Sequence, residues 1–173
     1  DEADVYIQHI SSDNILTMPD NGLVISNESL IQKSPVVRND GSGNAFVLWE
    51  DGRRGSGAIF TQHLNTNGQL TLSENGMEIY YGVDGKSDNI KSERINDSDI
   101  LLYWEDRENG VNSTYNFGKI VSNDYGSTYQ NAISVPNASL SENPAQLNAE
   151  VKKVGDNLFM GFLQDNFQAG VDP

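Results

Sequence analysis

The chain has 173 residues, enough for one ordinary domain with an apolar core, and it contains no cysteine. The sequence therefore excludes disulfides and thiolate metal sites. The net charge of -14 argues against nucleic acid and anionic membranes as partners, because both would repel the chain. No run of about 18 apolar residues appears, and the opening "DEADVYIQHI" lacks the basic start of a signal peptide.

A long repeat begins at the first predicted strand. The segment "VYIQHISSDNILTMPDNGLVI" (5–25) aligns without a gap on "IFTQHLNTNGQLTLSENGMEI" (59–79), at a spacing of 54 residues. The identical pairs include Gln8 and Gln62, His9 and His63, Thr17 and Thr71, Asn21 and Asn75, and Gly22 and Gly76. Because the two histidines fall in separate units, we expect each to do the same local job rather than to share a metal.

A second motif recurs along the chain. The stretch "WEDGRRG" (49–55) is followed 55 residues later by "WEDRENG" (104–110). We place a weaker third copy at Leu163, Gln164 and Asp165, and the turns around Asp13, Asn67 and Asp124 form a further set. Each unit thus spans about 55–59 residues, near the four-strand blade length of propeller repeats.

The local patterns predict strands throughout. The runs "NAFVLWE" (44–50) and "DILLYWE" (99–105) are short, apolar and bounded by turn residues, while "AIFTQHL" (58–64) and "STYNFGKI" (113–120) alternate in part. No helical periodicity extends beyond about ten residues. In each unit, the first strand begins near Pro35 or Asn89, the second is the Trp-Glu-Asp strand, the third follows it, and the fourth comes after Asn-Gly.

These units predict one all-β domain over 1–173 with twelve antiparallel strands. Its parts are a partial blade (1–30), a blade (31–84), a second blade (85–138) and a partial blade (139–173). Three blades' worth of strands is fewer than the four to eight of closed propellers. We therefore expect the chain to be part of a larger propeller.

The stretch "SNDYGSTY" (122–129) fits the pattern Ser-x-Asp-x-Gly-x-Thr-aromatic. It resembles the Asp-box of sialidase-like (BNR) β-propellers, which is the hairpin turn between the third and fourth strands of a blade. The resemblance implies a structural turn built from Ser122, Asp124, Gly126, Thr128 and Tyr129. Asp124 suits backbone amides as hydrogen-bond donors, and Gly126 suits a positive φ.

The Trp-Glu-Asp-x-Arg pattern is also similar to tandem repeats of large secreted bacterial surface proteins. The resemblance implies that the motif is a joint repeated in each blade. We expect Trp49 and Trp104 to fill the wedge between blades, and Asp51 and Asp106 to cap the turn that follows. Arg53 and Arg107 are expected to reach a neighbouring carboxylate.

The sequence predicts no catalytic residues and no metal site. A sialidase needs three arginines that converge on the substrate carboxylate, but two of the five arginines here belong to the repeated turn. Glu50 with Asp51, and Glu105 with Asp106, are neighbours on a strand and face opposite ways, which disfavours another glycosidase pair. Calcium at "NDGSGN" (39–44) or "DGKSDN" (84–89) stays open, although neither has EF-hand spacing. Sugar stacking stays open for four tyrosines near loops: Tyr80, Tyr81, Tyr115 and Tyr125.

The expected function is therefore that of a non-enzymatic, secreted or cell-surface segment. It would act in adhesion, in glycan or protein binding, or as a scaffold, with the remaining blades of a parent protein as its partners. Two alternatives remain. The first is a fragment of a sialidase-like glycoside hydrolase whose site lies in other blades. The second is exported cargo or a subunit bound to a secretion apparatus, of the type IX kind.

Overall fold

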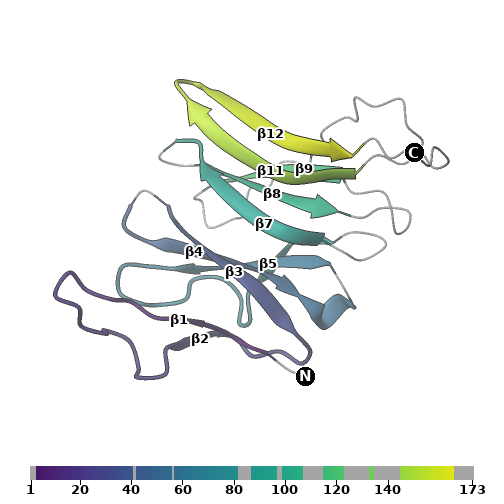
Figure 1. Cartoon of the computed structure of the whole chain (residues 1–173). Coiled ribbons are helices and arrows are strands. Elements are labelled where there is room, and N and C mark those ends of the chain that lie inside the picture. The colour runs from purple at the N-terminus through teal and green to yellow at the C-terminus, as the bar shows by residue number, and fades with distance from the viewer. Residues whose placement is uncertain are drawn as a thin grey trace.

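The computed structural model describes residues 3–40, 42–55, 57–81, 87–96, 99–106, 115–122, 133–134 and 145–165. These residues form twelve strands and one short 3-10 turn, with no other helix in these ranges (Figure 1). The strands are β1 Val5–Ile7, β2 Leu23–Ser26, β3 Gln32–Asn39, β4 Ala45–Asp51, β5 Ala58–Leu64, β6 Met77–Tyr81, β7 Ser87–Arg94, β8 Asp99–Asp106, β9 Tyr115–Ser122, β10 Ile133–Ser134, β11 Ala145–Val154 and β12 Asn157–Asp165; the 3-10 turn is η1 Gly52–Arg54. The expected all-β class is confirmed.

The strands form four antiparallel sheets in chain order. Their strand orders are β1-β2, β3-β4-β5-β6, β7-β8-β9-β10 and β11-β12. Figure 1 shows the sheets one above another, from β1-β2 at the bottom to β11-β12 at the top. The expected unit limits at 84–85 and 138–139 fall outside the described residues. In the ranges the structure describes, no helix has the length and apolarity to cross a bilayer.

The two four-stranded sheets share an unusual register. In β3 the pairing shifts so that Ser34 and Pro35 lie opposite Trp49, and in β7 the same shift leaves Asn89 and Ile90 opposite Trp104. Ser34 and Asn89 each have a φ of 54°, which is uncommon for residues other than glycine. One β-bulge therefore recurs in the two sheets, 55 residues apart.

The third copy of the motif corrects the sequence alignment. In β11 and β12 the register shifts between the pairs Leu147–Leu163 and Glu150–Gly161, so the extra residue lies opposite Phe162. Phe162 thus takes the backbone position of Trp49 and Trp104, and placing the copy at 163–165 is wrong by one residue. Burial agrees, because Leu163 is 64% exposed whereas the two tryptophans are 0% and 1% exposed.

Three apolar clusters fill the spaces between successive sheets. Strand β4 supplies two of them because its side chains alternate between its faces. The first cluster, toward β1-β2, contains Val5, Ile25, Val47, Trp49, Ala58 and Phe60. The second, toward β7-β10, contains Phe46, Leu48, Ile59, Ile79, Ile90, Ile100, Leu102 and Trp104. The third contains Tyr103, Ala149 and Val151, with Met160 against it. Each tryptophan therefore faces the sheet that precedes its own.

Candidate functional site

Asp51 is the centre of the most connected polar cluster. It ends β4, its side chain is buried, and it caps η1. Its Oδ1 accepts hydrogen bonds from the backbone N–H of Arg53 (2.9 Å) and from Arg53 Nε (2.8 Å), while Oδ2 accepts from Arg53 Nη2 (2.7 Å) and from Trp49 Nε1 (2.7 Å). Asp51 therefore occupies the capping position that the sequence indicates, and it holds Arg53 through a two-point ion pair.

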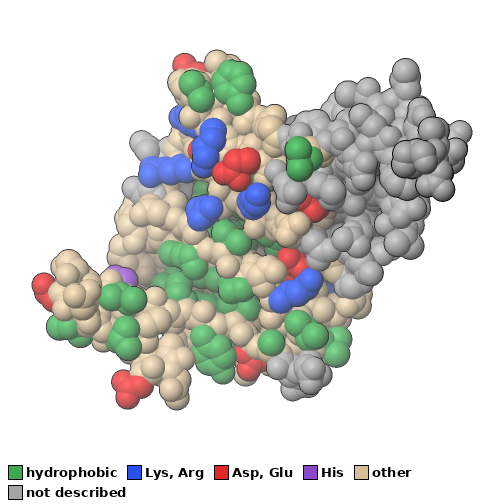
Figure 2. All heavy atoms as spheres, viewed as in Figure 1, with side chains coloured by type: hydrophobic (Ala, Val, Ile, Leu, Met, Phe, Trp, Pro, Cys, Tyr) green, Lys and Arg blue, Asp and Glu red, His purple; other side chains and the backbone are tan. Residues whose placement is uncertain are grey.

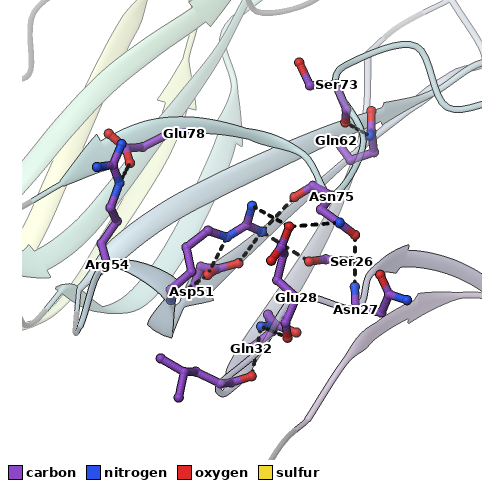
Figure 3. A network of polar contacts seen from close by, with 12 residues as sticks. Ser26, Asn27, Glu28, Gln32, Asp51, Arg54, Gln62, Ser73, Asn75 and Glu78 are labelled. Atoms are coloured by element: carbon purple, nitrogen blue, oxygen red, sulfur yellow. Dashed lines mark hydrogen bonds and ion pairs between the residues drawn. The ribbon is translucent and has the colours of Figure 1, made fainter.

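Arg53 joins this carboxylate to other parts of the fold. Figure 3 shows Asp51 near Ser26, Glu28 and Asn75, which come from other segments of the chain. Its Nη2 also donates to Asn75 O (2.8 Å) and to Ser26 Oγ (3.2 Å) at the end of β2. The guanidinium lies 3.9 Å from the centroid of the Phe60 ring, in cation–π geometry. A more distant ion pair of 4.0 Å links Nη1 to Glu28 Oε1. One side chain thus ties β4 to the preceding sheet and to the turn before β6.

The Asn75-Gly76 pair completes the cluster. Asn75 accepts a hydrogen bond from the backbone N–H of Asn27 (3.1 Å) and donates one to Glu28 Oε1 (3.0 Å). Gly76 has a φ of 84°, and a Cβ there would overlap Cη2 of Trp49 and lie 2.8 Å from Thr61 O. Only glycine fits this contact, which explains why the repeat keeps Asn-Gly.

The electrostatics of the cluster favour an ionised Asp51. Burial by itself raises the pKa of Asp51, but the hydrogen bonds from Arg53 and Trp49 and the positive charge of Arg53 outweigh it, so the pKa lies below its usual value. An ionised carboxylate that already accepts four hydrogen bonds is poorly suited to proton transfer. The cluster is therefore suited to holding sheets together rather than to acid–base chemistry.

The repeated glutamine serves a second structural purpose. Gln62 Oε1 accepts from the backbone N–H groups of His63 (2.9 Å) and Leu72 (2.9 Å), and its Nε2 donates to Ser73 O (2.9 Å). Gln8 makes the matching three bonds, from His9 N (3.0 Å) and Met18 N (3.2 Å) and to Pro19 O (3.0 Å). The two glutamines thus brace the same hairpin in successive units.

The two histidines make the same kind of contact, each with a threonine of its own unit. His63 Nδ1 lies 2.7 Å from Thr71 Oγ1, and His9 Nδ1 lies 2.5 Å from Thr17 Oγ1. His63 alone is fully buried, with Nε2 at 3.3 Å from Asp40 Oδ2 and its ring centroid 4.8 Å from that of Phe46. Each histidine thus makes the same local contact in its own unit, as the repeat indicates.

Asp40 lies in the "NDGSGN" loop, one of the two calcium candidates. Its carboxylate accepts from Asn44 Nδ2 (2.6 Å) and from the backbone N–H groups of Ser42 (2.7 Å) and Asn44 (3.1 Å). Burial raises the pKa of Asp40, but these bonds and the one with His63 outweigh it and lower the pKa overall. Hydrogen-bond donors of the loop itself thus bind the Asp40 carboxylate. No group of three or more metal-ligating side chains occurs in the described ranges, and residues 84–86 of the 84–89 loop lie outside them.

The adjacent carboxylates of the motif do not share a site. Glu50 is buried against Lys33 Nζ (2.7 Å), while Asp51 binds Arg53 on the opposite face of β4. In the second unit, Glu105 accepts a hydrogen bond from Asn89 Nδ2 (2.8 Å). Glu50 and Asp51 are thus separated as the strand alternation predicts and lack the geometry of a glycosidase pair.

The second copy of the joint is described only in part. Trp104 is buried with its ring centroid 4.6 Å from that of Tyr80, so it faces the β3-β6 sheet as Trp49 faces β1-β2. Asp106 ends β8 at the position of Asp51. Its side chain and all of Arg107 lie outside the described residues.

Most of the Asp-box lies outside the described residues as well. Ser122 is the last residue of β9, and Asp124, Gly126, Thr128 and Tyr129 follow in the undescribed segment. That segment connects β9 to β10, which pair antiparallel.

Of the four tyrosines considered for sugar stacking, two have side chains that the structure describes and two do not. Tyr80 packs against Trp104, and Tyr81 is exposed with its hydroxyl 3.4 Å from Arg54 O. Tyr115 begins β9 and Tyr125 follows it, and neither side chain is described. Among the described tyrosines of this set, Tyr81 alone presents an exposed ring.

Sequence reasoning missed the partners that come from other units. Ser26 and Glu28 contact Arg53 and Asn75 across two sheets, and no local pattern marks them. The sequence marks Asp40 as a turn residue and a calcium candidate, but not as the partner of His63. No protein-family model, no curated protein and no solved structure matches this chain.

Proposed function

We propose that the chain is a section of a secreted or cell-surface β-propeller whose four-stranded sheets are its blades. In this proposal the section is non-enzymatic and serves as a scaffold that binds glycan or protein. One observation carries it: the described side chains that recur along the chain bind other residues of the fold, which is a structural role. Trp49, Asp51 and Gly76 form the joint between sheets, and the glutamines and histidines brace hairpins.

The arginines support a non-enzymatic role. Arg53 is held by Asp51, Arg54 by Glu78 (2.9 Å), and Arg38 donates to Ser92 O (3.2 and 3.1 Å). Arg94 donates to Asn96 O (3.0 Å). A sialidase would need three guanidinium groups aimed at one point, whereas these four bind different partners in separate places.

Exposed apolar side chains support a binding role. The first hairpin and its surroundings expose Tyr6, Ile10, Ile15, Leu16 and Val24. Gathered apolar residues on a surface are typical of sites that contact another molecule. The net charge of -14 and the lack of cysteine fit a secreted or surface-exposed bacterial protein.

A labelled preparation of the chain on a glycan array, run beside hydrolysis of a fluorogenic sialoside, tests the proposal. We expect saturable binding to a subset of glycans or to a surface protein, without sialoside turnover. Turnover that disappears in Arg38→Ala or Arg94→Ala would contradict it and favour the hydrolase alternative. Co-purification with a membrane secretion complex, without glycan binding, would favour the cargo alternative.

A further inference from the structure

We propose that a second copy of this chain supplies the strands that complete the proposed propeller: the two copies join head to tail, with β12 of one copy pairing alongside β1 of the next, an inference that rests on the proposed function. In the described part of the fold, β1 is hydrogen-bonded to β2 alone and β12 to β11 alone, so each has one open edge. Figure 1 shows these strands at opposite ends of the stack, with both four-stranded sheets between them. The two edges of one copy are therefore too far apart to pair with each other.

Strand β1 is the counterpart of β5. The glutamine and histidine contacts of residues 8 and 9 repeat those of residues 62 and 63, which fixes the alignment at 54 residues. Strand β5 has a neighbour on both sides and runs for 7 residues, whereas β1 runs for 3. The neighbour that β1 lacks is the counterpart of β4.

Strand β12 is that counterpart of β4. The bulge opposite Phe162 matches the bulge opposite Trp49, which places Phe159 at the position of Phe46. Strands β4 and β5 pair with each other. Their counterparts, β12 and β1, can therefore pair in the same way when they come from two copies. The β4-β5 register then predicts the register of the new pairing: Phe46 lies opposite His63, so Phe159 would lie opposite His9.

The side chains fit this register. Phe46 and His63 are 2% and 0% exposed, whereas Phe159 is 59% exposed and His9 is also exposed. Trp49 lies opposite Phe60, so Phe162 would lie opposite Tyr6, whose ring is exposed. Figure 2 shows hydrophobic side chains on the surface at both ends of the stack. Phe159 and His9 are thus exposed at the two ends of the stack, whereas their counterparts in the β4-β5 pair are buried.

A second copy offers a pairing partner of the right kind for each open edge, its β1 for β12 and its β12 for β1. Pairing of β12 with β1 would make a four-stranded antiparallel sheet, β11-β12-β1-β2, with main-chain hydrogen bonds supplying affinity. Such a head-to-tail interface closes into a ring or continues as an open chain. Two copies closed on each other would contain six four-stranded sheets. Because each copy carries a net charge of -14, we expect association to strengthen as salt screens the repulsion.

Disulfide trapping tests the register directly, since the natural chain has no cysteine. Two single variants, Phe159→Cys and His9→Cys, are mixed and oxidised. We expect a disulfide-linked pair of chains, because residues directly opposite on antiparallel strands have the spacing that a disulfide needs. The matched control mixes Phe159→Cys with Ile10→Cys, whose side chain would point to the other face of the sheet, and should give little cross-linking.

Light scattering of the unmodified chain provides the second measurement. We expect a mass of at least twice 19.0 kDa as concentration and salt rise. Phe159→Lys, a change at an exposed position, should return the mass to that of one chain with an unchanged circular dichroism spectrum. A chain that stays at 19.0 kDa at every concentration, equal cross-linking of Ile10→Cys and His9→Cys, or a Phe159→Lys variant that still associates would each overturn the proposal.

Discussion

Trp49 donates its indole N–H to Oδ2 of Asp51 at 2.7 Å, so the first and third residues of the Trp-Glu-Asp triplet bind one another. Residues two apart on a strand share a face, which makes this contact available wherever the triplet forms a strand end. The same Asp51 holds Arg53, and Arg53 covers the ring of Phe60, the residue opposite Trp49. The motif therefore works as one unit that closes a joint between sheets.

Two adjacent arginines should differ sharply in their contribution to stability. Arg53→Ala leaves the buried Asp51 carboxylate without its charged partner, and we expect a loss of about 3 kcal/mol in the free energy of unfolding. Arg54→Ala removes an ion pair with Glu78 and should cost less than about 1 kcal/mol. The two arginine side chains are 18% and 59% exposed, respectively. Urea denaturation of both variants measures the difference, and equal costs would contradict the role given to Arg53.

Two glycines with similar backbone angles provide a second matched pair. Gly76 and Gly68 have φ values of 84° and 76°, but a Cβ meets Trp49 only at Gly76 and open space at Gly68. Gly68→Ala should therefore cost about 1–2 kcal/mol for the backbone angle alone. Gly76→Ala should cost about 2 kcal/mol more, because Trp49 must shift. Thermal unfolding of the two variants checks this, and a Gly76→Ala chain as stable as Gly68→Ala would be inconsistent with the close contact.

Acid should weaken the fold through Asp51 and Asp40. The pKa of each carboxyl is lowered in the folded chain from an ordinary value of 3.8. Their contribution to stability is thus present above about pH 3.8 and is lost as the pH falls below it toward the folded pKa. Denaturation midpoints between about pH 7 and pH 2 should drop in this acid range. In Asp51→Asn the drop should be smaller, and an unchanged drop would rule out Asp51 as one of its sources.

Much of the fold was predictable because it depends on local and repeated signals. Short apolar runs bounded by turn residues place β4 and β8, and the Asn-Gly pairs mark the starts of β2 and β6. The joint at Asp51 was also readable, since Trp49, Asp51 and Arg53 are close in sequence.

What escaped prediction depends on contacts between distant residues. The third copy was placed at Leu163 because Asp165 looked like Asp51, but the bulge in β11 sets the register and puts Phe162 there. Glu28 reaches Asn75 from the preceding sheet, and Asp40 reaches His63 across a hairpin. These partners follow from how sheets stack, which no local pattern in the sequence specifies.

The central claim is that Trp49 and Trp104 occupy the same kind of place, each between its own sheet and the preceding one. The most direct test is the fluorescence of two single-tryptophan variants, Trp49→Phe and Trp104→Phe, with iodide as quencher. We expect both variants to emit at short wavelength with little quenching, because both indoles are buried. A long-wavelength, readily quenched emission from either tryptophan in a folded chain would contradict the claim.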